Sequence, residues 1–539
     1  MTNESKSPEN SSRDVTTLRR ILPQIIAVTV KNSLLLAYGM TIGFPTILIP
    51  NLSGGNPKEK IVLGTEAISW IGSANFLVVP LGCLFSGIAT QPIGRRKAMQ
   101  IFTLPFLASW LLFHFASHSW EVFFALCLTG LTGGLLEAPT LTYLAEVTTP
   151  NLRGVLASTS TVAIIAGILI EFLLGTFMDW RTVALVSCIV PILSCVCLFF
   201  VPESPYWLIS KNRFEEAQKS TAWLRGWLEI EEVEHEFKEL CEQLKKSGTS
   251  RNTFSAENRG FIEKLKKAKQ NLTMYTKKPF LWPFSLVSLT FALGHFSGMT
   301  TLQTYAVNIF ATLKAPIDKY YATIILGIAE ALGCILSSML VHFVGKRKMN
   351  FLSLLGTGIC FFIVATYAHL INVNSLKIVT KDENLDVEGQ SWLPLTFLVG
   401  AAFFTHCGIR ILPWMLIGEV YYSKIRATAS GFSGAMSYIF GFLANKIFFS
   451  MISALTLPGT FWLYSAVCML GLLLLYFLLP ETEGKTLYEI TEHFAGRNKL
   501  NNKVHNFVRV KTNREKQLDN GVDNKAFDED SSHEINTKF

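Results

Sequence analysis

The sequence is poor in charge. Only 16% of its 539 residues are Asp, Glu, Lys or Arg, whereas half are hydrophobic. A soluble protein would carry roughly a quarter charged residues, so the shortfall indicates a chain that lies in lipid. The formal net charge of +8 resides mainly in loops and tails, where positive residues orient membrane segments. We therefore interpret the net positive charge as a signal of membrane orientation and expect no nucleic-acid binding.

The sequence also lacks the motifs of disulfide frameworks, metal sites and common enzymes. Nine of the ten cysteines lie in apolar runs, Cys241 lies in a charged segment, and no CxxC spacing occurs. Neither a disulfide framework nor a metal site is indicated. The zinc-protease helix HExxH, the nucleophile elbow GxSxG and a glycine-rich phosphate loop with its lysine are also absent. We expect no enzyme activity, no cofactor and no metal.

Long hydrophobic runs are what the sequence has in abundance. The first begins near Ile21 and is too long for a cleavable signal peptide. Each run is near the ~20 residues that a helix needs to cross ~30 Å of hydrocarbon. The runs lie at about 22–49, 66–89, 98–117, 120–145, 155–178 and 181–201, and then at 280–311, 319–343, 350–371, 393–418, 427–452 and 459–479. The predicted fold is an all-α membrane protein with about twelve transmembrane helices in two pseudo-symmetric six-helix bundles.

Charged residues recur at matching places in the two halves. Glu146 and Arg153 stand between two apolar runs, and Glu419 and Arg426 repeat their Glu-x6-Arg spacing roughly 270 residues later. Two other pairs recur at similar shifts: Gly-Arg-Arg-Lys at 94–97 with Gly-Lys-Arg-Lys at 345–348, and Pro-Glu-Ser at 202–204 with Pro-Glu-Thr at 480–482. Parallel repeats of this kind build two-bundle transporters. The sequence therefore predicts a carrier.

The charged segments between the apolar runs divide the chain into five parts. They are an N-terminal tail (1–20), an N-terminal six-helix bundle (21–202), a central loop (203–279), a C-terminal six-helix bundle (280–480) and a C-terminal tail (481–539). Lys and Arg concentrate on one side, so the positive-inside rule places both termini and the central loop in the cytoplasm. Residues 214–218, 233–244 and 261–269 of that loop show helical periodicity and predict short amphipathic helices. Asn51, in the sequon Asn51-Leu52-Ser53, then lies outside and is a glycosylation candidate.

These motifs resemble the sugar porter family of the major facilitator superfamily over nearly everything between the tails. Residues 175–180 (Gly-Thr-Phe-Met-Asp-Trp) and 413–419 (Pro-Trp-Met-Leu-Ile-Gly-Glu) are most similar to the insect facilitated trehalose transporters. The resemblance implies a plasma-membrane carrier that moves a small polar solute, a sugar such as trehalose or a hexose, by alternating access. Proton-coupled relatives tend to carry an aspartate where this chain has Gly39. We therefore favour facilitative transport, although Glu330 or Glu137 remains a possible proton site.

Charges at the predicted cytoplasmic helix ends suggest a latch between the bundles. Opposed acids and bases there would pair, hold the bundles together and separate as the carrier rocks. The alternative is plain positive-inside topology with solvated acids, which contributes little per pair. The residues concerned are Arg95, Arg96, Glu146, Arg153, Glu203, Arg347, Glu419, Arg426 and Glu481.

The predicted substrate site departs from the family pattern. Sugar porters grip hydroxyls with side-chain amides, because one amide both donates and accepts hydrogen bonds. Most of those amides are replaced in this chain by hydroxyl-bearing or charged residues. Our candidate substrate residues are Thr161, Thr300, Tyr305, Glu330, Arg410, Trp414, Ser437 and Glu137.

The charges in this set require partners. A charge at mid-membrane costs at least roughly 2.5–3.5 kcal/mol. Arg410 lies nine residues before Glu419, and Glu137 lies nine before Glu146, so the two should have the same depth. We predict that Glu137 and Arg410 face each other across the cavity, as a gate or around a charged solute; a permanent structural ion pair is the alternative. Lys31 is expected to snorkel towards the cytoplasm, and three histidines are interpreted as satisfied interior or interface residues: His295, His342 and His406.

Two other functions stay open. One is a carrier of the same fold for charged or amino-acid-like solutes, which the cavity charges favour. The other is a non-transporting nutrient sensor that signals through its tails. The C-terminal tail is polar, has no obvious docking motif and is predicted to be disordered. Beyond the solute and the lipid bilayer, the sequence indicates no obligate protein partner.

Overall fold

Every regular element in the described residues is a helix. The structure is a computed structural model that describes residues 17–54, 59–246, 276, 278–378, 390–421, 426–497 and 499–501. The first set of helices is α1 (Thr17–Leu52), α2 (Thr65–Ile93), α3 (Arg95–Phe115), α4 (Ser119–Leu135), α5 (Glu137–Val147), α6 (Pro150–Phe177), α7 (Trp180–Ser187) and α8 (Ile189–Phe199). The second set is α14 (Lys278–Phe296), α15 (Met299–Thr304), α16 (Ala306–Thr312), α17 (Lys319–Val344), α18 (Lys346–Leu370), α19 (Trp392–Cys407), α20 (Leu412–Val420) and α21 (Arg426–Leu478).

Several spans consist of more than one of these helices. In the described parts of the chain, ten helical segments are long and apolar enough to cross a membrane, and α4 with α5, α7 with α8 and α19 with α20 each form one of them. The last segment covers two spans, because α21 is broken at Thr456, whose φ is 68°. The shorter helices α14 to α16 complete the set. This confirms the predicted all-α membrane fold with about twelve spans.

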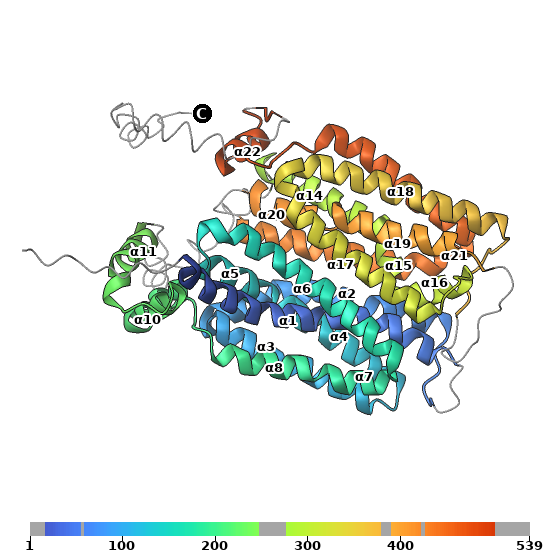
Figure 1. Ribbon diagram of the computed structural model, residues 1–539, viewed down its shortest axis with the longest axis horizontal. Helices are drawn as coiled ribbons and strands as arrows, with labels where there is room; N and C mark the ends of the chain where they lie inside the picture. Colours follow the sequence, from blue (N-terminus) through green and yellow to red (C-terminus); the bar gives the residue numbers. More distant parts are fainter. Residues whose placement is uncertain are drawn as a thin grey trace, which may run out of the picture.

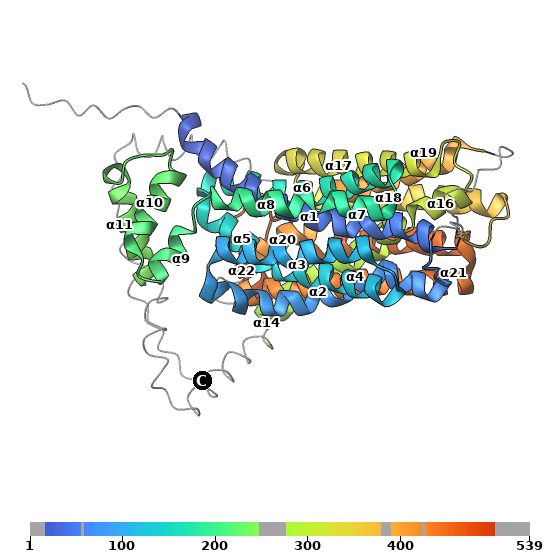
Figure 2. The same cartoon turned by 90° about the horizontal axis from the view of Figure 1, so that it is seen from below.

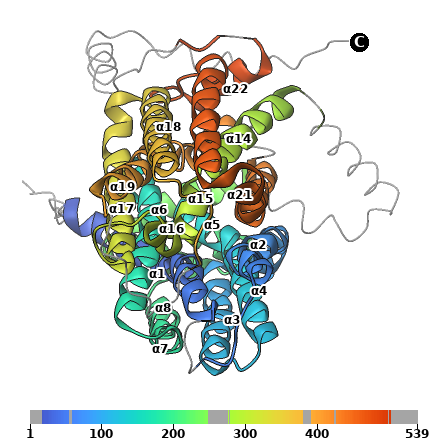
Figure 3. The ribbon, with the colours of Figure 1, turned by 90° about the vertical axis from the view of Figure 1, so that its right-hand side faces the viewer.

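The two sets form two bundles. In Figure 1 the helices α1 to α8 occupy the lower half of the picture and α14 to α21 the upper half, and the end-on view of Figure 3 shows the same separation. Two seams join the bundles, since α2 packs along α21 and α6 packs along α17. A carrier of this architecture works by movement of one bundle against the other, so the groups at these seams decide which end is open.

Short helices gather at one end of the bundles. They are α9 (Pro205–Ser210), α10 (Phe214–Leu224), η1 (Glu231–Val233), α11 (Glu234–Lys246) and α22 (Leu487–Ala495). Figure 2 shows α9 to α11 side by side beyond that end. Helices α10 and α11 confirm two of the three amphipathic helices predicted in the central loop, and the third, at 261–269, lies outside the described residues. We call this the basic end, because Arg95, Arg153 and Lys346 lie there, and the other the opposite end.

Glycine permits the tight turns at the basic end. Gly94 joins α2 to α3 with a φ of 105°, and Gly345 joins α17 to α18 with a φ of 90°. Residues with a Cβ rarely adopt this left-handed region. At Gly94 a Cβ would also lie 2.6 Å from Glu203 Oε2. These turns explain why both repeated motifs begin with glycine.

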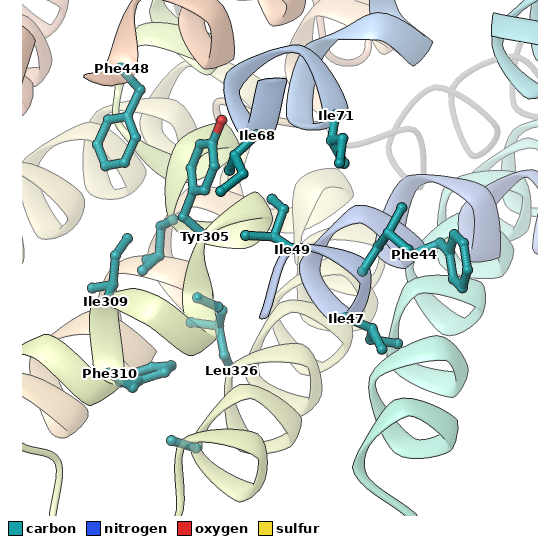
Figure 4. Packing of buried hydrophobic residues seen from close by; sticks show 14 of the residues in the cluster. Phe44, Ile47, Ile49, Ile68, Ile71, Tyr305, Ile309, Phe310, Leu326 and Phe448 are labelled. Atoms are coloured by element: carbon teal, nitrogen blue, oxygen red, sulfur yellow. The ribbon is translucent and has the colours of Figure 1, made fainter. Parts of the chain in front are cut away.

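The largest hydrophobic cluster joins the bundles towards the opposite end, and a smaller one joins α6 to α17 across their seam. The largest cluster includes Phe44 and Ile68 from the first bundle with Tyr305, Leu326 and Phe448 from the second (Figure 4). Towards the basic end two further clusters each draw mostly on one bundle. Among the described glycines, an added Cβ would meet open space at Gly64 near the opposite end and at four positions in the basic-end half, namely Gly87, Gly154, Gly418 and Gly431. The bundles thus pack together closely at the opposite end, which we call sealed, and share less hydrophobic contact at the basic end.

Candidate substrate site and helix-end ion pairs

Four side chains from three spans form a hydrogen-bonded network in the middle of the second bundle. His295 Nδ1 lies 2.9 Å from Thr300 Oγ1, and His295 Nε2 lies 3.1 Å from Ser437 Oγ. Arg410 Nη1 donates to Thr300 Oγ1 at 2.9 Å and lies 3.3 Å from His295 Nδ1. A guanidinium only donates, so Nδ1 accepts and Nε2 carries the hydrogen donated to Ser437. The predicted residues Thr300, Arg410 and Ser437 are therefore brought together.

Breaks in two helices position this network. Helix α14 ends at Phe296 and α15 starts at Met299, with Gly298 between them at a φ of 92°. Arg410 lies in the turn that separates α19 from α20. Broken helices at membrane depth are tolerated where they line a cavity or are buried in protein. The breaks turn side chains of the seventh and tenth spans towards each other.

Glu330 supplies the negative charge nearest this network. It lies on α17, is fully buried, and accepts a hydrogen bond from Gln303 Nε2 at 2.7 Å. Glu330 and Arg410 interact electrostatically. The second bundle therefore contains an acid and a base that compensate each other at membrane depth.

The first bundle contains its own acid and base. Lys31 on α1 is 1% exposed, and its Nζ donates to Ser160 Oγ of α6 at 2.7 Å. Glu137, at the start of α5, interacts electrostatically with Lys31. The expectation that Lys31 snorkels is wrong, because α1 packs along α6 and encloses it. The predicted pairing of Glu137 with Arg410 is not seen: the base that acts on Glu137 is Lys31 and the acid that acts on Arg410 is Glu330, although neither combination is an ion pair within 4.0 Å.

The other predicted substrate residues lie around or beyond the network. Trp414 of α20 packs edge-on against Phe291, with ring centroids 5.1 Å apart. Thr161 follows Ser160 on α6 and is partly buried. Tyr305 lies nearer the opposite end, inside the hydrophobic cluster, and stacks on Phe448 with ring centroids 5.0 Å apart. Tyr305 therefore belongs to the seal in this conformation.

The sequence analysis omitted three residues of this region from the site. His295 is hydrogen-bonded, as expected, but it stands at the centre of the network. Gln303 holds Glu330, and its position three residues after Thr300 on a helical segment was the available signal. Tyr438 follows Ser437 and packs near Trp414, with ring centroids 6.2 Å apart. Nothing in the local pattern of the eleventh span marks it.

At the basic end of the first bundle, Arg95 and Glu146 form a bidentate ion pair. Arg95 Nε and Nη2 each lie 3.0 Å from an oxygen of Glu146. Glu203 accepts the backbone N–H groups of Arg95 at 3.0 Å and Arg96 at 2.9 Å, as a carboxylate does at a helix N-terminus. Arg153 is exposed and donates to the Thr148 carbonyl at 3.3 Å.

The second bundle repeats this arrangement with a lysine. Lys346 Nζ pairs with Glu419 and, at 2.8 Å, with Glu483. Glu481 accepts the N–H groups of Lys346 and Arg347, each at 3.1 Å. Burial alone raises the pKa of Glu483, but Lys346 and then His342, 2.7 Å away, outweigh it and hold that pKa below its ordinary value. The side chain of Arg426 lies outside the described residues.

Each of these ion pairs lies within a single bundle. No ion pair within 4.0 Å joins the two bundles in the described residues. A latch between the bundles would therefore have to form in another conformation. The latch stays a prediction.

The sequon asparagine is not presented for glycosylation as folded. Asn51 lies in the last turn of α1, is 1% exposed, and its Nδ2 donates to the Ile47 carbonyl at 2.8 Å. The first apolar run was predicted to end near residue 49, but α1 extends to Leu52. Attachment of a glycan would require this last turn to unwind.

Comparison with known proteins decides the family. The family described as "Sugar (and other) transporter" matches residues 33–494, which is most of the chain. The chain belongs to this family. It is a carrier of the major facilitator superfamily that spans the membrane many times, and its family implies a sugar-like solute.

Relatives of this sugar transporter are found among insect proteins. The chain is 28% identical over 496 residues to the facilitated trehalose transporter Tret1 of Bombyx mori, which covers 90% of this chain and 89% of that protein. It is 30% identical over 433 residues to the same transporter of Aedes aegypti, over 80% of this chain but only 50% of that longer protein.

Solved structures share the fold. The proton:xylose symporter XylE bound to 6-bromo-6-deoxy-D-glucose superposes with a TM-score of 0.63 and 20% identity, over 88% of this chain and 99% of that one. The inward-open conformation of XylE from E. coli gives a TM-score of 0.63 and 19% identity, over 86% of this chain and 98% of that one.

Proposed function

We propose that this protein is a facilitative carrier for a neutral sugar, such as trehalose or a hexose, in the plasma membrane. It works by alternating access, with its basic end in the cytoplasm. The observation that carries the proposal is that each bundle places one base within electrostatic reach of one acid at membrane depth; a further, buried acid, Glu171 of α6, accepts a hydrogen bond from Ser187. Lys31 acts on Glu137 in the first bundle, and Arg410 acts on Glu330 in the second.

This balance favours a neutral solute for a physical reason. Charges that are compensated inside one bundle stay compensated when the bundles part, so opening exposes no uncompensated charge. A charged solute would have to displace one partner and leave the other buried and unpaired, which costs several kcal/mol. A solute with many hydroxyl groups can instead exchange hydrogen bonds with Thr300, Ser437 and Arg410.

Facilitative transport is supported by the packing at Gly39. A Cβ at this position would overlap with the backbone carbonyl oxygen of Ile164 on α6. An aspartate, the residue that proton-coupled relatives tend to carry there, cannot be accommodated without separating α1 from α6. This chain therefore lacks that proton site.

The orientation follows from the positive-inside rule. Arg95, Arg96 and Lys97 lie at the basic end with Arg153 and Lys346, so the sealed opposite end faces outwards and the carrier is inward-facing. When the basic end closes, the exposed Arg153 approaches the second bundle and can complete the predicted latch.

Uptake by the purified protein in liposomes tests the proposal. Labelled trehalose, glucose and an amino-acid mixture are compared, each with and without an imposed proton gradient. We expect downhill, saturable sugar uptake that is indifferent to the gradient and absent from empty liposomes. Sugar uptake that requires the gradient would overturn the facilitative mode, and uptake of amino acids without sugars would overturn the substrate.

The charged-solute alternative keeps one observation in its favour. Four of the ionisable side chains at membrane depth, which also include Glu171, offer two positive and two negative partners: Lys31, Glu137, Glu330 and Arg410. A zwitterion could bridge one of each, and the amino-acid arm of the uptake experiment decides this. The sensor alternative depends on the C-terminal tail, whose part beyond residue 501 lies outside the described residues.

A further inference from the structure

One buried amide joins both bundles in the opposite-end half. Asn445 on α21 is fully buried. Its Nδ2 donates to the carbonyl of Gly72 on α2 at 2.7 Å and to Thr304 Oγ1 on α15 at 3.1 Å. Helix α2 belongs to the first bundle, whereas α15 and α21 belong to the second. A single side chain therefore ties three helices together across the α2–α21 seam.

Two further hydrogen bonds between the bundles flank Asn445. Thr46 Oγ1 of α1 donates to the Gln303 carbonyl at 2.8 Å, and Ser69 Oγ of α2 donates to the Lys446 carbonyl at 3.1 Å. Both use hydroxyl groups, and a hydroxyl can turn to another acceptor as the helices move. Asn445 differs because its donor serves two acceptors, one of them in the other bundle. When the opposite end opens, the amide loses Gly72 and is left partly unsatisfied.

We propose that Asn445 is the positioning residue that holds the opposite end shut, so that its amide sets the balance between the form open at the basic end and the form open at the opposite end. The amide bonds to Gly72 only while the two bundles touch. It therefore stabilises one of the two forms and contributes nothing across the seam to the other. A difference of this kind shifts a two-state equilibrium. The proposal requires that the bundles part at one end at a time, whichever solute is carried.

The chain offers a matched control in Asn75. This residue is also an asparagine, is 3% exposed, and donates from Nδ2 to Thr129 Oγ1 at 2.8 Å. Both partners lie in the first bundle, on α2 and α4. Replacing Asn75 removes a buried amide of the same kind without touching the seam.

Hydrogen–deuterium exchange on the full chain in lipid nanodiscs, without solute, tests the proposal. We expect Asn445→Ala to speed exchange in the opposite-end segments at 65–76 and 437–450 by about 5- to 10-fold, as the loss of one net hydrogen bond predicts. Exchange in the basic-end segments at 85–93 and 426–434 should slow in return. Asn75→Ala should speed exchange in α2 and α4 with no such slowing.

The reciprocal pattern is the deciding result. If Asn445→Ala changes exchange only locally, as Asn75→Ala does, Asn445 is an ordinary packing residue and the proposal fails. Asn445→Asp offers a second variant of the same size, should the alanine variant not fold; its carboxylate cannot donate to the Gly72 carbonyl and should shift exchange at least as far. An aspartate variant with unchanged exchange would equally overturn the proposal. Because no solute is present, failure of sugar transport has no bearing on the outcome.

Discussion

Arg410 donates a hydrogen bond to Thr300 Oγ1 at 2.9 Å, and this contact joins the break in the tenth span to the break in the seventh. The two residues are more than a hundred positions apart in the chain. Glu330 lies within electrostatic reach of the same guanidinium. The polar centre of the second bundle is therefore held by one arginine.

Replacing Arg410 with methionine should destabilise the protein and slow transport at least about 10-fold. Removal of one partner leaves Glu330 buried without its base, a loss typically worth about 3–5 kcal/mol. Adding Glu330→Gln should recover part of the lost thermal stability. Thermal unfolding and uptake of the single and double variants measure this. Unchanged transport with unchanged solute preference in Arg410→Gly would discard a role of Arg410 in binding.

If the charges interact within each bundle, a second substitution should restore stability only when both residues belong to the same bundle. Lys31→Met should lower stability because it leaves Glu137 without its base, and Glu137→Gln should restore much of the loss. Glu137→Gln should not restore Arg410→Met, since the two residues belong to different pairs. Coupling energies from double-mutant cycles decide this. A strong coupling between Glu137 and Arg410 would show that the charges pair across the cavity instead.

Gly72→Ala should push the opposite ends of the bundles apart. The new Cβ would lie 2.7 Å from the Tyr305 hydroxyl oxygen and 2.9 Å from Thr304 Cγ2, both in the other bundle. The strain exists only while that end is sealed, so the variant should populate the form open at the opposite end. We expect slower transport with near-normal thermal stability, and a rise in labelling of the opposite-end half by water-soluble reagents.

Two other glycines provide the contrast for Gly72. At Gly39 the clash with Ile164 lies within the first bundle, so Gly39→Ala should lower thermal stability in every conformation. At Gly87 the added methyl group meets open space. Gly87→Ala should leave transport unchanged and stabilise α2 by about 0.5–1 kcal/mol. Equal effects of all three substitutions on transport would contradict this assignment of the clashes.

Stability should fall in acid through an ion pair at the opposite end. Partial burial alone raises the pKa of Glu59, but hydrogen bonds from Arg181 and then Trp180 outweigh it and hold that pKa below its ordinary value. A lowered folded-state pKa stabilises the fold at pH values above the unfolded-state pKa, and this contribution is lost as the pH falls through the folded-state pKa. Glu59→Gln should therefore flatten the decline of the melting temperature between about pH 6 and about pH 3. Arg181→Gln should flatten it too, and an unchanged decline in both variants would exclude this pair as a source.

Much of the fold could be predicted because its signals are local. Length and hydrophobicity identify a membrane span without reference to any other span, and the repeated turns at Gly94 and Gly345 mark the two halves. The end of α1 could not be located in this way, because Asn51 joins the helix through its hydrogen bond to Ile47. The sequence placed the break between its last two predicted spans only as closely as residues 453–458, and the structure puts it at Thr456.

The candidate site was only partly predictable, for a reason that its residues illustrate. Thr300, Arg410 and Ser437 were found as departures from a family pattern, but their common partner, His295, required coordinates. Equal depth suggested a pairing of Glu137 with Arg410. Depth, however, does not determine the direction in which a side chain points around its helix. That direction brings Glu137 towards Lys31 and Arg410 towards Glu330.

The sequence by itself determined that this protein is a two-bundle membrane carrier, because spans, repeats and loop charges are properties of short stretches of chain. The tertiary structure alone decided how the charges pair, which end is sealed and that Asn445 joins the bundles. Those outcomes depend on contacts between residues that are hundreds of positions apart, such as Asn445 with Gly72. The rotation of each helix in its bundle sets such contacts, and no local pattern encodes that rotation.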